Sequence, residues 1–470
     1  MSYEIEADRN QTFLFPPALD DWIPQDHPAR FIASFVDTLD LQSLGFEVGH
    51  APTGRPRFSA RLLLSVICYC YFSRIRSLRG MEQACQENVA LMWLTGFEKP
   101  DHNTLWRFWR DNRGPLRGLL RKSVQVAGDM GLLGMVLHAV DGTKIRAQAS
   151  LKTGVYRKKL KDALELLDKS IREMEEGIEA SVNTEIGSCR LPQELLDART
   201  RKEMIEGSLE VLDEAQTNSL NPSEPDARIM KCSGVKTFGY NAQAVADGMI
   251  GIVVGTKVVS NETDTGLLAT MIDSAVETVG AKPTQTLADK GYSAAQDLAD
   301  AGKKGHEILV NLKRDVSPPG DEKPFHSSRF PFDAENDCCI CPIGGILRFQ
   351  HAYKDHGKPC RVYHCAGFKE CPRRMECSKN KRGRSIKLGQ NHQAVRNQID
   401  KQKDPEAKSQ LARRSVIVEP VFAIVKEILG FRKWSVQGIE GVQTQWALMC
   451  TTVNLRKLYT AWRANLLALA

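Results

Sequence analysis

Two long segments of unusual composition interrupt this chain, and they constrain what it can fold into. Residues 156–217 are rich in charge, and their leucines recur at spacings of three and four residues. That spacing predicts amphipathic helices, which we expect to form a hairpin. Residues 315–410 are rich in proline and cysteine and then strongly basic. We therefore expect one core, built from the residues on either side of two insertions.

The remaining runs point to a mixed sheet. In chain order they read strand, strand, strand, helix, strand, helix, strand, helix, and the first and fourth strands each lead to an aspartate. A hairpin is expected around Gly248, because the apolar runs 238–247 and 250–259 flank that glycine. Three early strands followed by interspersed helices favour an α/β, RNase H-like mixed sheet over a uniform βαβ series.

An all-α segment is expected before this sheet. Residues 59–71 are almost continuously apolar, and a second helical pattern covers about 78–94. The predicted domains are a helical N-terminal DNA-binding domain at 1–130, the first part of the core at 131–314 with a hairpin insertion at 155–220, a Cys-rich basic insertion at 315–410, and the second part of the core at 411–470.

Charge is distributed unevenly along the chain. The whole chain has 64 Lys and Arg against 57 Asp and Glu, a net charge of +7. Between Tyr353 and Lys387, however, eleven basic residues face three acidic ones. A local excess of this kind suits a clamp on a polyanion such as DNA. The alternative is a partly disordered loop at 379–387.

Nothing in the sequence indicates a membrane protein or a secreted one. No apolar run reaches the length of about 18 residues that a membrane-spanning helix needs, and the first residues lack the basic and apolar regions of a secretory signal. The expectation is a soluble, cytoplasmic protein.

Arginines recur near the end of the helical segment. Arg107, Arg110 and Arg113 are spaced by three residues and alternate with aromatic residues such as Trp106 and Trp109. Arginines at that spacing lie along one face of a helix and can follow DNA phosphates. The alternative is a solvated helix face above buried tryptophans.

Two aspartates are expected to meet at one edge of the sheet. The run 135–140 ends at Asp141, where Gly142 is expected to turn the chain, and a short strand at 285–288 leads to Asp289. Carboxylates held together by adjacent strands repel each other, and divalent cations relieve that repulsion. Each aspartate alone also has a structural interpretation, as a turn residue or a helix cap.

A third carboxylate is expected from the last helical region. Glu419 is the candidate, and Lys426 lies seven positions on, which is two helical turns away on the same face. Pro420 disfavours helical geometry at Glu419, so the helix is expected to start there, with Glu419 at its N-terminus. Alone, Glu419 could equally be a surface residue.

Cysteines cluster in the second insertion. Seven of the thirteen fall within 40 residues, and Cys338 and Cys341 have a C-x2-C spacing. With Cys371 and Cys377 they would suit a tetrahedral structural zinc. The alternative is a set of free, buried thiols.

Three other polar residues receive structural interpretations. We expect Tyr292 to pack rather than to catalyse, and His138 to pack or to lie at the surface. Asp264 follows the hairpin and could approach the site, but we interpret it as an ordinary cap.

Four segments resemble DDE transposases of bacterial insertion sequences. Residues 54–96 and 100–110 are similar to the family's InsH-type N-terminal domain. VDGTKI resembles its first-Asp strand and ADKGY its D-x-G-Y motif. Residues 413–434, with 446–458 behind them, resemble its C-terminal Glu block. The four segments follow the family's order and span nearly the whole chain.

The resemblance implies roles for individual residues. Asp141, Asp289 and Glu419 match the catalytic triad, which would hold two Mg²⁺ (or Mn²⁺) ions. Arg414 and Lys426 match basic residues that contact DNA phosphates, although no tyrosine occupies the family's upstream position. In the Cys-rich insertion the family has a C-x2-C-P, and Phe368 stands where its first cysteine would be, so Cys365 or Cys338 could substitute.

The implied function is that of an insertion-sequence transposase. Such an enzyme binds the terminal inverted repeats of its element, hydrolyses donor strands and joins the 3′-hydroxyl ends to target DNA, as a dimer on DNA. Two alternatives remain: an inactive or domesticated DNA-binding repressor, and a metal-dependent DNA nuclease that cuts without joining.

Overall fold

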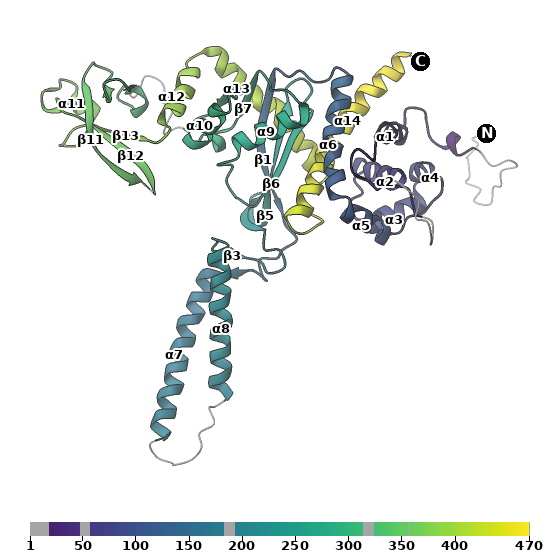
Figure 1. Ribbon diagram of the computed structural model, residues 1–470, viewed down its shortest axis with the longest axis horizontal. Coiled ribbons are helices and arrows are strands. Elements are labelled where there is room, and N and C mark those ends of the chain that lie inside the picture. Colours follow the sequence, from purple (N-terminus) through teal and green to yellow (C-terminus); the bar gives the residue numbers. More distant parts are fainter. Residues whose placement is uncertain (1–17, 48–56, 183–192, 314–323, 356, 470) are drawn as a thin grey trace, which may run out of the picture.

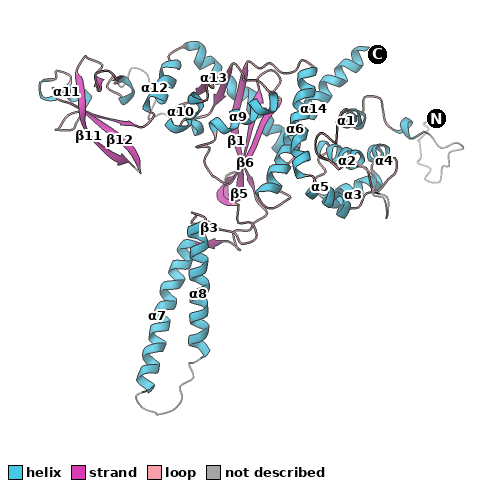
Figure 2. Ribbon diagram, in the orientation of Figure 1, coloured by secondary structure: helices cyan, strands magenta, loops and turns pink. Residues whose placement is uncertain are grey.

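The computed structural model describes residues 18–47, 57–182, 193–313, 324–355 and 357–469. A mixed sheet with helices on both sides forms the body of the molecule, and the N-terminal helices pack at one end of it (Figure 1). A small second sheet lies at the other end, and a long helical hairpin projects from the body (Figure 2). No helix of the described residues is long and apolar enough to cross a membrane.

The N-terminal part is helical, and side-chain caps set the helix boundaries. The pattern over 78–94 predicts one helix, but the structure breaks it at Asn88, whose side-chain oxygen accepts from Ala90 N and Leu91 N. Asp101 caps the next helix by accepting from Thr104 N at 2.6 Å. The elements are η1 Leu19–Trp22, α1 Pro28–Asp37, α2 Ala60–Phe72, α3 Leu78–Glu87, α4 Val89–Thr95, α5 His102–Asp111 and α6 Arg113–Asp129.

The main sheet has six strands in the order β4-β5-β1-β7-β8, and β6 also pairs with β5. The β1–β5, β5–β6 and β4–β5 pairs are antiparallel, whereas β1–β7 and β7–β8 are parallel. The expected hairpin around Gly248 is present between β5 and β6. The strands are β1 Leu137–Arg146, β4 Arg228–Cys232, β5 Val235–Asp247, β6 Val253–Val259, β7 Gln285–Ala288 and β8 Ile308–Val310.

The first strand is longer than the sequence predicts. We expected a turn after Asp141, but β1 continues to Arg146. The reason is its long partner, because β5 remains paired with β1 beyond that point, with Gly142 opposite Gln243 and Lys144 opposite Asn241. The parallel neighbour β7 ends at Ala288, opposite Val140. Asp141 therefore lies within a strand, just beyond the end of the parallel pairing.

Helices cover both faces of this sheet. α9 packs on β6, β5 and β1, whereas α13 packs on β1, β5, β7 and β8. The longest helix, α14, crosses from the sheet to α6 and so ties the N-terminal helices to the core. Two buried tryptophans anchor the core: Trp446 Nε1 donates to Gln243 O at 2.7 Å and Trp434 Nε1 to Ile145 O at 3.2 Å. The helices are α9 Leu268–Val279, η2 Lys290–Tyr292, α10 Ala295–Lys303, α12 His392–Lys401, α13 Pro405–Ala423, the π-helical turn η5 Ile424–Ile428, and α14 Ile439–Leu469.

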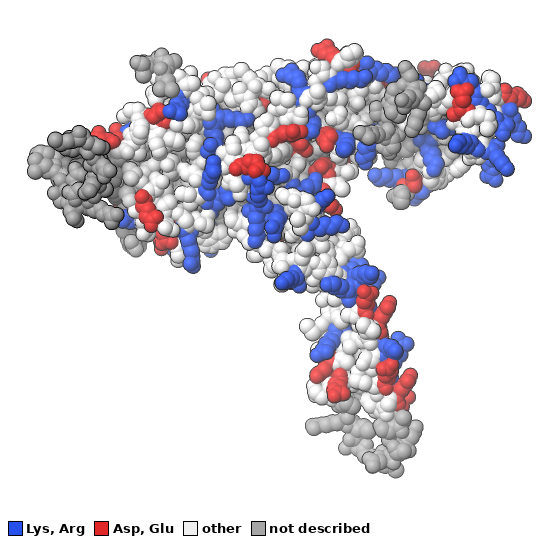
Figure 3. All heavy atoms as spheres, turned by 180° about the vertical axis from the view of Figure 1, so that it is seen from behind, with Lys and Arg blue, Asp and Glu red and all other residues white. Residues whose placement is uncertain are grey.

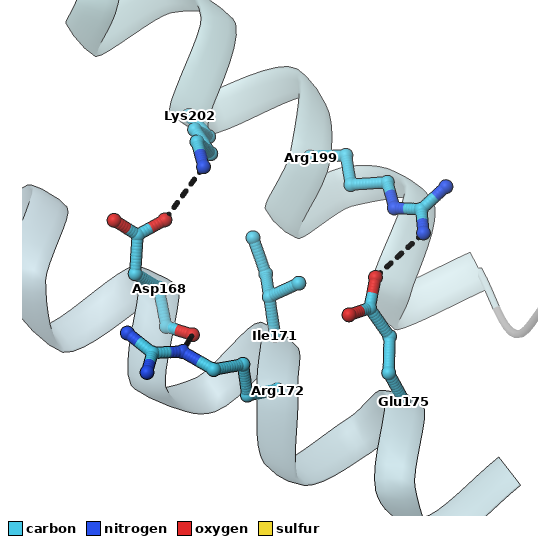
Figure 4. A pocket seen from close by; sticks show the side chains of 6 residues that line it. All are labelled: Asp168, Ile171, Arg172, Glu175, Arg199 and Lys202. Atoms are coloured by element: carbon cyan, nitrogen blue, oxygen red, sulfur yellow. Dashed lines mark hydrogen bonds and ion pairs between the residues drawn. The ribbon is translucent and has the colours of Figure 1, made fainter. Parts of the chain in front are cut away.

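The charged insertion forms the predicted helical hairpin. It consists of α7 Arg157–Val182 and α8 Gln193–Glu214, with a short β2–β3 ladder (Val155–Tyr156 and Ser219–Leu220) at its base. A hollow of about 360 Å³ opens between its helices (Figure 4). Two ion pairs bridge it, Lys202–Asp168 at 2.7 Å and Arg199–Glu175 at 2.6 Å. Because these pairs are exposed to solvent, each contributes little to stability, and the hollow is a feature of the helix packing.

The Cys-rich segment contains the second sheet, with the order β13-β12-β11-β10-β9. Its own small core surrounds Phe330, Tyr363 and Leu347, separate from the main core. The elements are η3 Ser327–Arg329, β9 Phe332–Asp333, β10 Cys338–Ile340, β11 Ile346–Asp355, β12 Lys358–Cys365, η4 Phe368–Glu370, α11 Arg374–Cys377 and β13 Ser385–Gly389.

Candidate catalytic site and nucleic-acid interface

Asp141 and Asp289 follow adjacent parallel positions in the sheet. Val140 and Ala288 are register partners, so the residues that come next leave the pairing side by side. Their charges interact, since Asp289 contributes to the raised pKa of Asp141. The main cause of that raised pKa is burial, and the nearby Arg414 guanidinium opposes it.

Helix α13 brings the other charged residues to these aspartates. Arg414 Nη1 donates to Asp141 Oδ2 at 2.8 Å, and Arg414 Nη2 lies 3.8 Å from Glu419 Oε1. Arg414 is 12% exposed and Asp141 23%, whereas Glu419 is 62% exposed. The guanidinium therefore lies between the Asp141 and Glu419 carboxylates as their shared counter-ion. Of these three side chains, that of Glu419 is the most exposed.

Glu419 does not begin a helix, which corrects the sequence-based expectation. α13 begins at Pro405, where Asp404 caps it, and continues through Pro420 to Ala423. Pro420 has no N–H to donate within the helix. A π-helical turn follows at Ile424–Ile428, in which Leu429 N donates to Ile424 O at 2.7 Å. Such turns are rare inside helices and often occur at functional sites.

Lys426 lies on that π-helical turn and within electrostatic range of Asp141. Burial is the main cause of the lowered pKa of Lys426, and the charge of Arg432 lowers it further. The Asp141 carboxylate acts in the opposite direction. The site thus combines carboxylates with at least two partly buried cations, Arg414 and Lys426.

The donor chemistry of the three carboxylates fits a hard divalent cation. All three offer only oxygen ligands, and the negative charges of Asp141 and Asp289 destabilise each other. Within the described residues, however, no group of three or more His, Cys, Asp or Glu side chains is placed to hold a metal ion. Glu419 is the member that stands apart, because it contacts Arg414 rather than the aspartates.

A buried polar network lies beside the carboxylates, and the sequence analysis missed it. Asp264, expected to be an ordinary cap, accepts at Oδ1 from Asn241 Nδ2 and Gln243 Nε2, both at 2.8 Å. Lys144 Nζ lies 3.5 Å from the same oxygen. The Tyr292 hydroxyl donates to Gln243 Oε1. One signal was present: Asn241 and Gln243 interrupt the apolar run of β5 two residues apart, and hence on one face.

His138 is fully buried, as expected of a packing residue. Its Nε2 lies 3.6 Å from Asp247 Oδ2, and that carboxylate accepts from Gly134 N, Met135 N and Met249 N. The Asp247 carboxylate therefore holds the loop before β1 in place by hydrogen bonds and is not part of the catalytic site.

Two family models match the chain. A transposase DDE domain matches residues 340–459, and a transposase domain (DUF772) matches residues 17–111. These matches confirm the resemblance to DDE transposases. The DDE match includes Arg414, Glu419 and Lys426 and supports an enzyme that cuts and joins DNA. Asp141 and Asp289 lie outside both matched segments. No curated protein and no solved structure matches the chain.

The candidate DNA-binding arginines lie on two helices rather than one. Arg107 and Arg110 are on α5, inside the DUF772 match, whereas Arg113 begins α6. Arg110 pairs with Asp111 at 2.7 Å, and the Arg113 guanidinium lies over the Trp109 ring at 5.5 Å. Arg107 is exposed, so it is the arginine of this set that is best placed for a phosphate.

The aromatic residues beside these arginines have mixed environments. Trp109 is buried, but Trp106 is 36% exposed and stacks on Trp109 with ring centroids 5.6 Å apart. The interpretation as wholly buried tryptophans is therefore correct for one of the two.

The basic segment of the chain lies largely on the second sheet. Lys and Arg side chains gather at this end of the molecule, and another group lies where the hairpin joins the body (Figure 3). Some of these charges are already paired, as in Arg361–Asp337 at 2.7 Å and the Arg373–Glu376 pair. The stretch 379–387, for which a disordered loop was the alternative, contains the start of β13.

The cysteines do not support the zinc prediction. Cys365 and Cys377 have raised pKa values, caused mainly by burial and also by the neighbouring thiols of Cys341 and Cys371. Cys338 lies outside the apolar cluster that contains Cys341. The thiols that approach one another are thus those of Cys341, Cys365, Cys371 and Cys377, and all four are free. The described residues include no cluster arranged to hold a metal.

Proposed function

We propose that this chain is an insertion-sequence transposase that cleaves DNA strands and joins 3′-hydroxyl ends to target DNA at Asp141, Asp289 and Glu419. The observation that carries the proposal is the convergence of three distant segments. Asp289, at the end of β7, lies beside Asp141 on β1. Arg414 on α13 contacts both Asp141 and Glu419. The three carboxylates follow the order of the family motif. The fold by itself would not require charged residues to meet in this way.

The strand arrangement supports an RNase H-like core. β6, β5 and β1 form three consecutive antiparallel neighbours, and β7 and β8 continue from β1 in parallel. This arrangement places Asp141, within β1, beside the carboxyl end of β7, and helix α13 packs on both strands. We therefore keep 131–314 and 411–470 as two parts of one core, with the segments at 155–220 and 315–410 as insertions, behind a helical domain at 1–130.

The carboxylates would hold Mg²⁺ or Mn²⁺. Such an ion would supply activation of the attacking water or 3′-hydroxyl and stabilisation of the leaving oxygen. The residues of the chain contribute position and charge. Asp141 is fixed by its strand and by Arg414, and Asp289 by the turn that follows β7. Arg414 and Lys426 add positive charge where a scissile phosphate would lie, which favours the more negative transition state.

DNA contacts would extend on both sides of this site. The helical part with Arg107 would bind the terminal inverted repeats, and the basic second sheet would hold flanking or target DNA. Phosphate contacts of this kind position DNA without reading its sequence. We propose that two copies act together, since cutting two element ends needs two sites.

The alternatives make different predictions in one assay. The substrate is duplex DNA from the regions that flank the coding sequence, incubated with a supercoiled target and Mg²⁺. A transposase gives joined products that disappear in Asp289→Ala. Asp300→Ala is the matched control, because the contacts of Asp300 on α10 are exposed ones, with Lys303 at 3.6 Å and with Gln296 Nε2 at 2.8 and 2.9 Å. Cleavage without joining indicates a nuclease, and binding alone indicates a repressor; either result would overturn the proposal.

A further inference from the structure

The buried network beside the carboxylates spans three separate elements. Asp264 precedes α9, Asn241 and Gln243 lie on β5, and Tyr292 ends the η2 turn. Asn241, Gln243 and Tyr292 are fully buried. In addition to its bonds to Asp264, Gln243 Nε2 donates to Asn241 Oδ1 at 2.9 Å. Burying so many polar groups is costly unless each has a partner, so the network holds its members in fixed positions.

The chemistry of the network leaves one orientation for the Gln243 amide. Its Nε2 faces the Asp264 carboxylate and the Asn241 oxygen, both of which can only accept. Its Oε1 is therefore left to accept from the Tyr292 hydroxyl. A negative charge at Asp264 thus polarises the amide, and the amide in turn orders the phenol. Burial keeps the pKa of Tyr292 well above its ordinary value, and the neighbouring Asp264, Asp141 and Asp289 carboxylates raise it further, so the phenol remains a donor.

Tyr292 links this network to the Asp289 turn. Tyr292 N donates to Asp289 O at 3.0 Å, which closes a turn of four residues. Inside that turn Gly291 faces Asp264, because a Cβ at Gly291 would lie 2.9 Å from Asp264 Oδ2. The turn is therefore held at one end by the phenol and in the middle by close packing against the carboxylate.

Contacts on β1 complete the connection. Gly142, directly after Asp141, faces the same network, since a Cβ there would lie 2.1 Å from Gln243 Nε2. Lys144 on the same strand pairs with Asp264. The glycines of both aspartate motifs thus pack on the Asn241–Gln243–Asp264 group, which is a common support beneath the two segments that present Asp141 and Asp289.

We propose that Asn241, Gln243, Asp264 and Tyr292 are positioning residues that set the spacing of Asp141 and Asp289 for divalent-cation binding. The inference rests on the proposed function for its choice of ligand. None of the four needs to touch the cation or DNA. They act through the backbone of the Asp289 turn and of β1. Residues just outside a metal site orient the metal ligands in a similar way.

The test compares Mn²⁺ binding by Tyr292→Phe and by a matched control. Binding is followed without DNA, by the loss of the free Mn²⁺ EPR signal. Tyr292→Phe removes one oxygen and leaves the ring packed, and we expect the half-saturating Mn²⁺ concentration to rise about tenfold or more. Tyr240→Phe is the control: Tyr240 is equally buried on β5 and donates to Glu224 Oε1 at 3.1 Å, but it belongs to a different group of contacts. Its Mn²⁺ binding is expected to match the wild type.

Asp264→Asn is the second variant, to be used if Tyr292→Phe does not fold. It keeps an acceptor oxygen but removes the charge that orients Gln243. We therefore expect a loss of Mn²⁺ affinity that is smaller than the loss in Tyr292→Phe. Equal Mn²⁺ binding by wild type and a folded variant would overturn the inference, as would an equal loss in Tyr240→Phe. Its failure is distinct from that of the proposed function: a chain that binds Mn²⁺ as predicted, yet neither cuts nor joins DNA, refutes only the function.

Discussion

Arg414 donates to Asp141 Oδ2 at 2.8 Å although 273 residues separate the two in sequence. This contact joins helix α13 to strand β1 at the point where the Asp289 turn also arrives. It supplies a partly buried carboxylate with positive charge and, through its second nitrogen, reaches Glu419 at 3.8 Å. Two of the three predicted catalytic carboxylates, Asp141 and Glu419, therefore share one arginine as their counter-ion.

Asp141→Asn should raise stability at neutral pH and abolish DNA cleavage. Because burial raises the pKa of Asp141, the folded state disfavours the ionised carboxylate. The stability that comes from the protonated Asp141 carboxyl is fully present below the ordinary carboxyl pKa. It is lost as pH rises through the raised pKa of the folded state. Relative to wild type, the variant should thus gain stability towards neutral pH, by about 0.5–2 kcal/mol, while DNA cleavage is abolished. Denaturant unfolding at acid and neutral pH checks this, and a gain confined to acid pH would contradict it.

Gly142→Ala should disturb the site more than its size suggests. The added Cβ would meet the Gln243 side chain at 2.1 Å, and overpacking of this kind costs about 1–3 kcal/mol. Both stability and cleavage should fall. Gly302→Ala on α10 is the control, because nothing lies within 4 Å of its Cβ; it should stabilise the helix by about 0.5–1 kcal/mol. Similar thermal midpoints for the two variants would show that the contact is unimportant.

Pro420→Ala should restore a helical N–H and stabilise α13. Proline inside a helix costs about 3 kcal/mol relative to alanine. Pro420→Ala should therefore raise the free energy of unfolding by part of that amount. We expect cleavage to decrease at the same time, because the π-helical turn that carries Lys426 begins only four residues later, at Ile424. A variant that is more stable and fully active would show that Pro420 does not help to position Lys426.

Arg107→Ala should weaken DNA binding by removing a phosphate contact. The slope of log K against log salt concentration should become shallower by about 0.9. Arg110→Ala is a matched comparison on the same helix and should change the slope less, because Arg110 already pairs with Asp111. Fluorescence anisotropy with a labelled duplex over a range of salt concentrations gives both slopes. Equal changes would mean that the Asp111 pair opens on DNA.

Lys457 should make stability depend on alkaline pH. Burial lowers the pKa of Lys457 from 10.5 to about 8, and its Nζ donates to Ile250 O at 2.7 Å and Gly251 O at 2.6 Å. Between these pKa values the unfolded chain binds more protons, so stability due to this group rises with pH, by up to about 3 kcal/mol. Subtracting the values for Lys457→Met isolates this contribution from other alkaline titrations. A difference that stays constant between about pH 8 and pH 10.5 would refute it.

The sequence by itself determined the order of elements, the helical insertion and the transposase resemblance. Local signals suffice for these, because apolar spacing and capping residues act over a few neighbours, as at Asp101. The strand before Asp141 and the short strand before Asp289 were predicted in the same way, and the structure pairs them in parallel.

Only the tertiary structure decided where those elements end and what surrounds the carboxylates. β1 continues past Gly142 because β5 pairs with it, and α13 continues through Pro420 because its packing on the sheet outweighs one missing hydrogen bond. Asp264 enters the site through contacts with residues 21 and 23 positions away on β5. Contacts between distant segments depend on how strands and helices come together, and no local pattern of the sequence encodes that.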